Sequence, residues 1–469
     1  MQGMAIGDAM GARVEFLPLD YNYNGIKDMG KDIKNNFKLK PGQWTDDTSM
    51  GLCISDSLIE KKGEFDPRDI MMRFILWWRF GYNNSFRFDT KRKNRHSVGL
   101  GGNISESIKK YIKDSGKNEY TKSGDKNTSG NGSIMRNAAI PLCYFRDEEK
   151  ALEFAKKQSL ITHQGEEAAG CCQLMTFIIL KILKTKKILD ENNKDDKQTK
   201  NKDTKDLDNS NVFIVKNNEK IIKYENKKNI KLKDILEDLK DFNCEYKSVI
   251  CLANSKIENK DKNRNWNWKD KDFKYSEERA KEKPGYIGSY CMDGLAMALH
   301  VLYHTDTFEK AILKAVNLRG DADSVGSIVG QIAGAFYEFD SIPEDWIKEV
   351  NRWDKDEIAL RGFLLCHLNG KEEKNKEKIG QEEITNVDIN NINNINNKID
   401  EEKIKYEKVL NNEGTNILEE VESKEQNEIK NNEDSICCYC CFYCTCCKCC
   451  KCCKYCNICK CFNSSCICF

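Results

Sequence analysis

Two short acidic segments, far apart in the chain, constrain this sequence more than any other feature. The first is Trp44-Thr45-Asp46-Asp47-Thr48, and the second is Arg319-Gly320-Asp321-Ala322-Asp323-Ser324. Each places two carboxylates and a hydroxyl within a few residues, with no cysteine or histidine beside them. Oxygen-only ligand sets suit hard cations such as Mg2+, Mn2+ or Ca2+. A fold that brings both segments to one cleft would hold a pair of such ions, and paired-ion sites commonly carry out hydrolysis.

The spacing of apolar residues predicts helices. Apolar positions recur at helical intervals in 50–59, in 69–80 and in 167–183, and further helices are expected over 293–303 and 324–339. Alternation typical of strands is scarce, so we expect an all-α fold. The last helix carries Gly326, Gly330 and Gly334 on one face, and this spacing indicates close packing against a neighbouring helix rather than membrane dimerisation.

Composition changes along the chain and predicts its domain organisation. Residues 1–369 are expected to form one folded domain, interrupted at 187–228 by a low-complexity segment rich in Asn, Lys and Asp. We expect that segment to be a disordered surface loop. Residues 370–435 are expected to be a disordered linker rich in Asn, Lys and Glu, and 436–469 a cysteine-rich tail.

Charge and hydropathy restrict the partners and the location. The 76 basic and 75 acidic residues leave a net charge of +1, so no nucleic-acid partner is expected. The chain opens without a basic segment ahead of an apolar stretch, and it has no run of 18 or more uncharged apolar residues. We therefore expect an intracellular, cytoplasmic protein that acts as a monomer.

The tail contains 16 of the 24 cysteines and has three interpretations. It carries lysines and aromatic residues among its cysteines, so S-acylation would attach it to a membrane surface. Its overlapping CxxC spacings would also suit a thiolate cluster for Zn2+ or Cu+. Biased sequence without a defined role is the third interpretation. We favour the first, and we interpret the eight scattered cysteines as buried free thiols.

Three further segments carry chemistry but leave alternatives open. Glu15, at the end of Gly7–Phe16, is either a surface group at a helix end or a desolvated acid or base in a cleft. The loop Asn131–Arg136 is either a plain turn or a set of N–H groups that face an anion. His163, one of five histidines, precedes a predicted helix, where its ring can face a cleft or pack in the core.

Taken in order, these segments resemble the ADP-ribosylglycohydrolases. The resemblance runs through Gly7–Glu15, Trp44–Thr48, Gly130–Arg136, Thr162-His163 and Gly320–Ser324 with its glycine-rich helix. It implies an all-α helical bundle around a dinuclear cleft for two Mg2+ ions, with Mn2+ as a substitute. The implied metal ligands are Thr45, Asp46, Asp47, Asp321, Asp323 and Ser324. The implied substrate-binding residues are Asn131, Gly132, Ser133, Met135 and His163. The implied catalytic residues are Glu15, Asp46 and Asp323.

The resemblance implies a Mg2+-dependent hydrolase that cleaves the glycosidic bond at the distal ribose of ADP-ribose conjugates, reversing ADP-ribosylation. The expected partner is an ADP-ribosylated protein or a related small conjugate. The main alternative is a catalytically inactive ADP-ribose-binding protein tethered to membranes by its tail; a weaker one is a thiolate metal-binding protein. Two departures from the family pattern stand out: Arg319 occupies a position where many members have glycine, and Ser324 replaces the more usual threonine.

Overall fold

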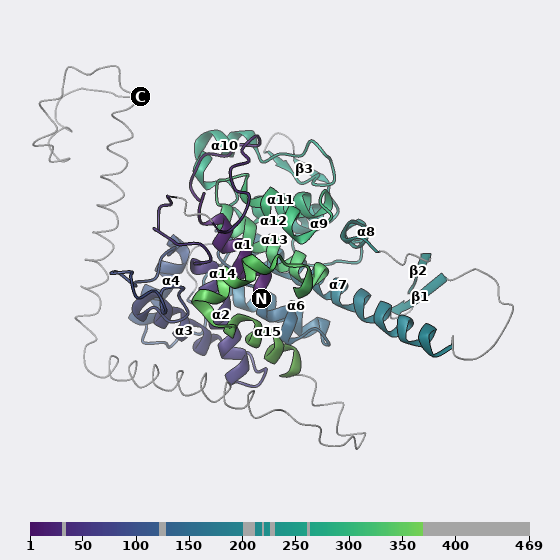
Figure 1. The fold of residues 1–469 in the computed structure, drawn as a ribbon, viewed down its shortest axis with the longest axis horizontal. Coiled ribbons are helices and arrows are strands. Elements are labelled where there is room, and N and C mark those ends of the chain that lie inside the picture. The colour runs from purple at the N-terminus through teal and green to yellow at the C-terminus, as the bar shows by residue number, and fades with distance from the viewer. Residues whose placement is uncertain are drawn as a thin grey trace, which may run out of the picture. The chain divides into compact units, whose positions relative to one another are not determined.

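The computed structural model describes residues 1–30, 34–121, 128–199, 212–217, 220–225, 230–259 and 263–368. This part of the chain is mostly helical (Figure 1), which confirms the all-α prediction. The predictions for the linker at 370–435 and for the cysteine-rich tail lie outside the described residues. The described residues belong to one compact unit, Met1–Glu382.

The helices follow one another with few strands between them. The first seven are α1 (Gln2–Gly11), α2 (Asp46–Glu60), α3 (Pro67–Phe80), α4 (Gly102–Lys113), α5 (Ala139–Cys143), α6 (Glu148–Leu160) and α7 (Glu166–Thr199). The later α-helices are α8 (Leu232–Glu237), α9 (Lys247–Ala253), α10 (Glu277–Glu282), α11 (Cys291–Tyr303), α12 (Phe308–Val316), α13 (Ala322–Tyr337), α14 (Glu344–Asp354) and α15 (Glu357–Leu368). Short 3-10 helices lie at Pro284–Tyr286 and Phe339–Ser341.

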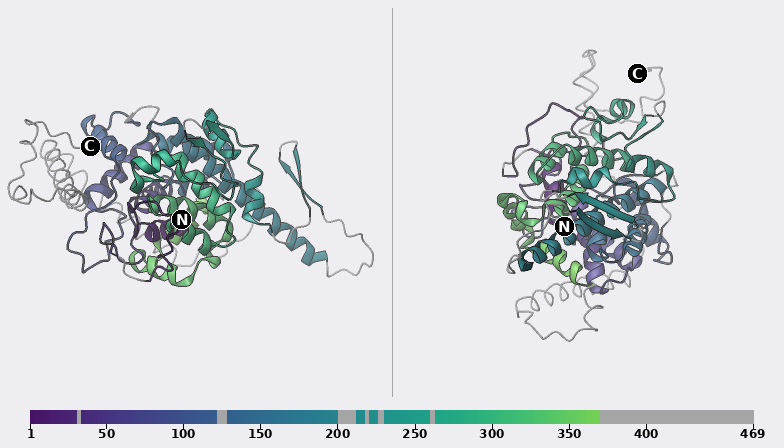
Figure 2. Two further views of the ribbon diagram at one scale, coloured as in Figure 1. Left: turned by 90° about the horizontal axis from the view of Figure 1, so that it is seen from above. Right: turned by 90° about the vertical axis from the view of Figure 1, so that its right-hand side faces the viewer.

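Helices α1 and α13 pack side by side and antiparallel within the compact unit, where purple and green helices lie together in Figures 1 and 2, and glycines let their backbones touch. A Cβ atom at Gly330 would lie 1.9 Å from the carbonyl oxygen of Gly3, and one at Gly7 would lie 2.0 Å from that of Gly326. Further along, Gly11 meets Ala322 in the same way. The predicted close packing of this glycine face is therefore confirmed, and it brings the end of α1 beside the second acidic segment.

Helix α3 begins and ends where its sequence predicts. The side chain of Asp66 accepts hydrogen bonds from the backbone N–H groups of Arg68 and Asp69, and Pro67 occupies the first helical position. Gly81 then ends the helix in the left-handed conformation, with φ of 74°. The helix predicted from the periodicity of 69–80 is confirmed here.

Helix α7 differs from the sequence-based expectation in two ways. It runs on to Thr199, into the segment expected to be a disordered loop, and the same segment contains the antiparallel hairpin β1 (Val212–Asn217) and β2 (Lys220–Glu225). Its part Glu166–Lys187 is also long and apolar enough to span a membrane by length and composition. However, 72% of its most apolar window is buried inside the fold, where α7 contacts α6, α11 and α13. Such burial is that of a core helix.

A second small sheet pairs β3 (Ile257–Asn259) with β4 (Arg264–Asn265). The predicted helices over 293–303 and 324–339 appear as α11 and α13, with boundaries shifted by at most two residues. The eight cysteines outside the tail are free thiols, as predicted, and five of them are buried. The prediction of burial is wrong for Cys244, Cys251 and Cys366, which are only partly buried.

Candidate metal centre

Asp8 organises the start of α2, although it lies on a different helix. Its carboxylate accepts hydrogen bonds from the backbone N–H and the hydroxyl of Thr45, at 3.0 and 2.8 Å. It also accepts from the N–H and the hydroxyl of Thr48, at 2.9 and 2.6 Å. These N–H groups are at the N-terminus of α2, where no intrahelical acceptor exists for them. Asp8 therefore holds the first acidic segment from α1.

The structure brings the two acidic segments into one buried site. Oxygen atoms of Asp8, Asp47 and Asp323 lie within 4.8 Å of one another, and so do oxygen atoms of Glu15, Asp321 and Asp323. Asp323 belongs to both groups, at the first turn of α13. All of these carboxylates are buried. Two adjacent groups that share one aspartate have the form expected of a site for two cations.

Without added positive charge, the negative charges of these buried carboxylates are unfavourable. Burial raises the pKa of Glu15 well above its ordinary value, and the neighbouring charges of Asp323, Asp321 and Asp46 raise it further. Burial, followed by the charge of Asp323, does the same to the pKa of Asp47. Among the described residues, no lysine or arginine forms an ion pair with a carboxylate of either group. Buried like charges without cations are unfavourable.

Two buried carboxylate oxygens in this site also lack hydrogen-bond donors. Glu15 Oε2 and Asp47 Oδ1 have no partner in the structure. Buried polar atoms are nearly always satisfied, so an orphaned pair in one site indicates a missing ligand. An all-oxygen donor set of carboxylates and hydroxyls fits hard divalent cations such as Mg2+. The residues present therefore fit the metal that the family resemblance implies.

The remaining implied metal ligands lie around these groups in different ways. The hydroxyl of Thr45 is 3.3 Å from Asp323 Oδ2 and 3.5 Å from Asp47 Oδ2, so it faces the site. Asp46 belongs to neither group but is buried beside them, and burial, followed by the charge of Asp8, raises its pKa. The hydroxyl of Ser324 lies 3.6 Å from the sulfur of Met135.

The loop Asn131–Arg136 lies against the second acidic segment. The side-chain amide of Asn131 donates to Asp321 Oδ2 at 3.0 Å, while its backbone N–H donates to Ser289 at 2.8 Å. A Cβ atom at Gly132 would lie 2.8 Å from the His163 ring, so only glycine leaves room for that ring. Asn131, Gly132 and His163 thus come together near the carboxylates.

His163 is buried and electrically neutral. Burial lowers its pKa to about 3, and the positive charge of Arg136 adds to the effect. Its Nδ1 atom lies 2.8 Å from the hydroxyl of Thr162, which also accepts a hydrogen bond from Arg136. The ring is therefore fixed in orientation and suited to hydrogen bonding or packing rather than to carrying charge.

Two of the implied substrate-binding residues, Ser133 and Met135, also connect the loop to neighbouring helices. The hydroxyl of Ser133 accepts a hydrogen bond from Ser159 at 2.8 Å in a fully buried position. The backbone carbonyl of Met135 accepts from Ser327 and Gln331 on α13. These contacts attach the loop to α6 and α13.

Two residues near the site were not identified from the sequence. One is Asp8, described above, and the other is Gly99, whose φ is +87°. A Cβ atom at Gly99 would lie 1.9 Å from Asp46 Oδ1, so this loop closes directly over the carboxylate. The only signal in the sequence was the position of Asp8 within the first motif; nothing local marked Gly99.

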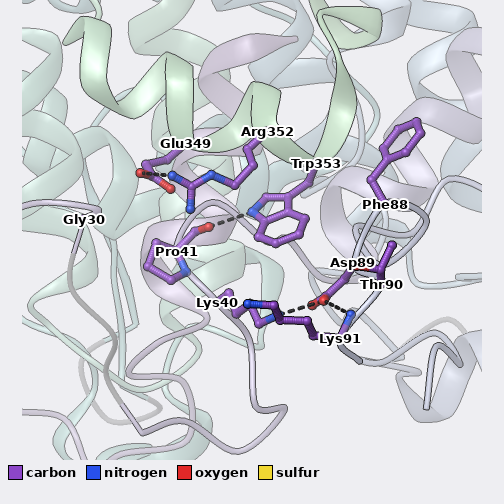
Figure 3. Close-up of a pocket in the computed structure, with 10 residues that line it drawn as sticks. All are labelled: Gly30, Lys40, Pro41, Phe88, Asp89, Thr90, Lys91, Glu349, Arg352 and Trp353. Carbon is purple, nitrogen blue, oxygen red and sulfur yellow. Dashed lines mark hydrogen bonds and ion pairs between the residues drawn. The ribbon is translucent and has the colours of Figure 1, made fainter. Parts of the chain in front are cut away.

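The segment that leads into Thr45 is held on both sides (Figure 3). Asp89 accepts hydrogen bonds from Lys40 at 2.7 Å and Gln43 at 2.9 Å, and the indole of Trp353 donates to Pro41 at 2.7 Å. A hollow of about 500 Å³ lies between these residues. The charges that line it are mostly paired with one another, as Arg352 is with Glu349. The contacts restrain the chain just before the first acidic segment.

Arg319, the departure in the second segment, is engaged outside the carboxylate groups. Its φ of +65° is the conformation that glycine adopts readily. Its guanidinium lies 3.7 Å from the centre of the Tyr23 ring and 3.6 Å from a carboxylate oxygen of Asp20. The arginine therefore retains the glycine-like backbone while its charge is held by these two residues.

The fold and the site define a helical protein with a buried, carboxylate-rich centre for divalent cations. The family model of ADP-ribosylglycohydrolase matches residues 1–374, and the chain belongs to that family.

Curated relatives align with about three quarters of the chain. It is 29% identical over 352 residues to an ADP-ribosylarginine hydrolase, Tri1, of Pseudomonas putida strain GB-1, covering 74% of this chain and 72% of that protein. It is 24% identical to the ADP-ribosyl-[dinitrogen reductase] glycohydrolase of Rhodospirillum rubrum, covering 78% of this chain and 94% of the relative. A solved structure titled ADP-ribosylglycohydrolase-related protein complex has the same fold, with a TM-score of 0.50, 23% identity, and coverage of 78% of this chain and 95% of that one.

Proposed function

We propose that the protein is a Mg2+-dependent hydrolase that releases ADP-ribose by cleaving the glycosidic bond at its distal ribose. The observation that supports this most is the sharing of Asp323 between two buried carboxylate groups that lack any cationic partner among the described residues. Family membership supports the reaction class. The linkage to test first is that to arginine, because the Pseudomonas putida relative is named an ADP-ribosylarginine hydrolase.

The residues that would hold the ions are those of the two groups, with Thr45 beside them. When bound, two Mg2+ ions would supply positive charge that offsets the buried carboxylates and favours a nucleophilic water. Asn131 would keep Asp321 in place through its 3.0 Å hydrogen bond. Asp8 would keep Thr45 in place through its own.

Glu15 is the proposed proton-transfer group. Hydrolysis at the anomeric carbon of a ribose passes through an oxocarbenium-like state, and the leaving group needs a proton. Burial raises the pKa of Glu15, which favours the protonated form of its carboxyl. A carboxyl group in this condition can give a proton to the leaving atom or take one from water.

A product assay tests the proposal. The full-length protein would be incubated with ADP-ribosyl-arginine, ADP-ribosyl-serine and O-acetyl-ADP-ribose, with Mg2+ or with EDTA, and free ADP-ribose would be quantified. We expect Mg2+-dependent release from at least one substrate, and loss of release in Asp323→Asn but not in Asp340→Asn, which changes an exposed carboxylate on the surface. Binding of ADP-ribose without release from any substrate would instead support the inactive reader.

A second proposal concerns the location of the protein and the role of its cysteine-rich tail. We propose a cytoplasmic protein whose cysteine-rich tail is S-acylated and associates with membranes, because cysteines, lysines and aromatic residues alternate there. Hydroxylamine-sensitive acyl groups on residues 436–469, together with recovery in the membrane fraction, are the expected results. A tail-bearing protein found wholly in the soluble fraction would contradict them.

A further inference from the structure

A second pocket, separate from the carboxylate site, lies between α11, α12 and two loops. It has a volume of about 530 Å³ and is lined by residues 21–24, residues 271–274 and the facing sides of the two helices. None of the site carboxylates lines it. Its volume is within the range of pockets that hold small molecules. We call it the Tyr21 pocket.

The Tyr21 pocket presents positive charge that is free to meet an anion. Lys271, Lys274 and Lys314 line it, and in the described part of the chain none of them has a carboxylate within ion-pair distance. One carboxylate, that of Asp272, also lines the pocket, so the lining side chains still carry more positive than negative charge. Burial lowers the pKa of Lys314, which a bound anion would reverse. Lys274 Nζ lies 5.2 Å from the centre of the Tyr21 ring, so an anion here would meet a lysine held beside that ring and would displace no carboxylate from any of the three lysines.

The same pocket offers flat aromatic surface. The ring of Tyr21 is 40% exposed, and its position is fixed because the hydroxyl accepts a 2.8 Å hydrogen bond from the backbone N–H of Tyr275. Tyr23, Phe273 and His300 complete the aromatic lining. The Nδ1–H group of His300 donates to the carbonyl of Trp268 at 3.0 Å, which sets the orientation of the ring, and burial lowers the pKa of His300 to about 4. Fixed aromatic rings are favourable surfaces for stacking a nucleobase.

Positive charge and aromatic surface together select a particular ligand class. A phosphate group would meet the lysines, and a planar base would stack on the exposed ring of Tyr21, with the exposed amides of Asn22 and Asn24 near the base edges. We propose that the Tyr21 pocket binds a free nucleoside phosphate at a site distinct from the carboxylate centre.

A ligand bound in the Tyr21 pocket would also affect the second acidic segment, because the two share contacts. Tyr23 of the pocket lies under the guanidinium of Arg319, and Leu318, which also lines the pocket, accepts a backbone hydrogen bond from Asp20. Asn317 fixes the same stretch to Ile26 with two hydrogen bonds, at 3.0 and 2.9 Å. These contacts connect the pocket to the backbone that carries Asp321 two residues beyond Arg319.

Photolabelling with 8-azido-ADP, followed by peptide mapping of the full-length protein, locates the site directly. We expect label on peptides that contain 21–24 or 271–274, and the same label in Asp323→Asn, because this site does not depend on the carboxylate centre. The triple variant Lys271→Gln/Lys274→Gln/Lys314→Gln should lose that label by about tenfold or more, since each lost charge-assisted hydrogen bond weakens binding severely. The matched control is Lys62→Gln/Lys113→Gln/Lys348→Gln, which makes the same change in net charge on exposed lysines elsewhere.

Three results would overturn the proposal, provided that each variant keeps the wild-type melting temperature. They are label confined to peptides around 131–135, label on the pocket that the triple variant retains, and displacement of the probe by a single-stranded oligonucleotide at lower concentrations than by ADP. The last would assign the pocket to nucleic acid instead. Because labelling needs no turnover, failure of the hydrolase proposal would leave this test unaffected.

Discussion

The carboxylate of Asp8 accepts a 2.6 Å hydrogen bond from the hydroxyl of Thr48, and this bond joins α1 to α2 across the candidate metal centre. The carboxylate of Asp8 also accepts hydrogen bonds from the backbone N–H groups of Thr45 and Thr48. One residue therefore belongs to a carboxylate group and at the same time caps the helix that supplies Asp47 to that group. The position of the metal-site carboxylates and the start of α2 therefore both depend on Asp8.

Replacing Asp8 by Asn should weaken metal binding more than it alters the fold. An amide has one acceptor oxygen, so its NH2 group would face donors that now point at a carboxylate. Loss of a group that orients metal ligands typically costs roughly 10–100-fold in metal affinity. Isothermal titration with Mg2+ would measure it. Thr48→Val, which removes only one of the four donors, should have the smaller effect, and equal affinities in Asp8→Asn and the wild type would contradict this role.

Metal removal should lower the stability of the wild-type protein. A cation at about 100 times its Kd stabilises the folded state by roughly 2.7 kcal/mol. We therefore expect the melting temperature to rise with Mg2+ and to fall with EDTA in scanning fluorimetry.

Asp323→Asn should remove most of the stabilisation by Mg2+. It removes a buried charge that raises the pKa of Glu15 and Asp47, so the metal-free variant should be at least as stable as the metal-free wild type. It should gain little from Mg2+, because Asp323 belongs to both groups. An equal response to Mg2+ in the variant and the wild type would place the ions elsewhere.

Much of the fold was predictable because its signals are local. The periodicity of α3 and its cap at Asp66, and the glycine spacing of α13, are each determined by neighbours within one or two turns. The two acidic segments were identifiable because each concentrates carboxylates in a few residues.

The features that escaped prediction depend on residues distant in the chain. Asp8 acquires its role from donors on another helix, and Gly99 from its approach to Asp46. The extension of α7 to Thr199 follows from propagation, because a helix begun in a buried apolar segment continues at little cost into polar sequence. No local pattern in the Asn- and Lys-rich sequence predicts this extension of the helix.

Gly99→Ala should disturb the site without unfolding the protein. Alanine is strained at a φ of +87°, and its Cβ would overlap Asp46 Oδ1. Displacement of a site residue by about 1 Å can reduce turnover by roughly 100-fold. The rate of ADP-ribose release would be compared with that of Gly102→Ala, where the new Cβ meets nothing within 4 Å. Similar rates in the two variants would show that this contact is unimportant.

Gly326→Ala should destabilise the packing of α1 against α13. Its Cβ would lie 2.5 Å from the carbonyl oxygen of Gly7, which is backbone and cannot swing aside. Overpacking of this kind costs about 1–3 kcal/mol or more. In Gly334→Ala the nearest atom would be 3.6 Å away, an ordinary contact, and the better helix propensity of alanine should leave stability unchanged or higher. Urea unfolding of both variants would measure the difference, and equal losses would contradict close packing as the cause.

The ion pair between Asp56 and Arg361 should make stability depend on pH. Burial opposes charge on Asp56, but the guanidinium 2.6 Å away and other donors hold the pKa of its carboxyl below the ordinary 3.8. Because the folded-state pKa is the lower one, the stabilisation is present above pH 3.8 and is lost as pH falls through the folded-state value. Asp56→Asn leaves the buried Arg361 with only its longer, 3.5 Å ion pair to Glu357, and breaking the closer buried pair costs about 3 kcal/mol or less at pH 7. Urea unfolding from pH 7 down to pH 3 should show the gap between wild type and variant narrowing only below pH 3.8, whereas Asp306→Asn, in a fully exposed pair with Lys310, should show no measurable change. A gap that stayed constant over this range would mean that the charge of Asp56 is not what stabilises the fold.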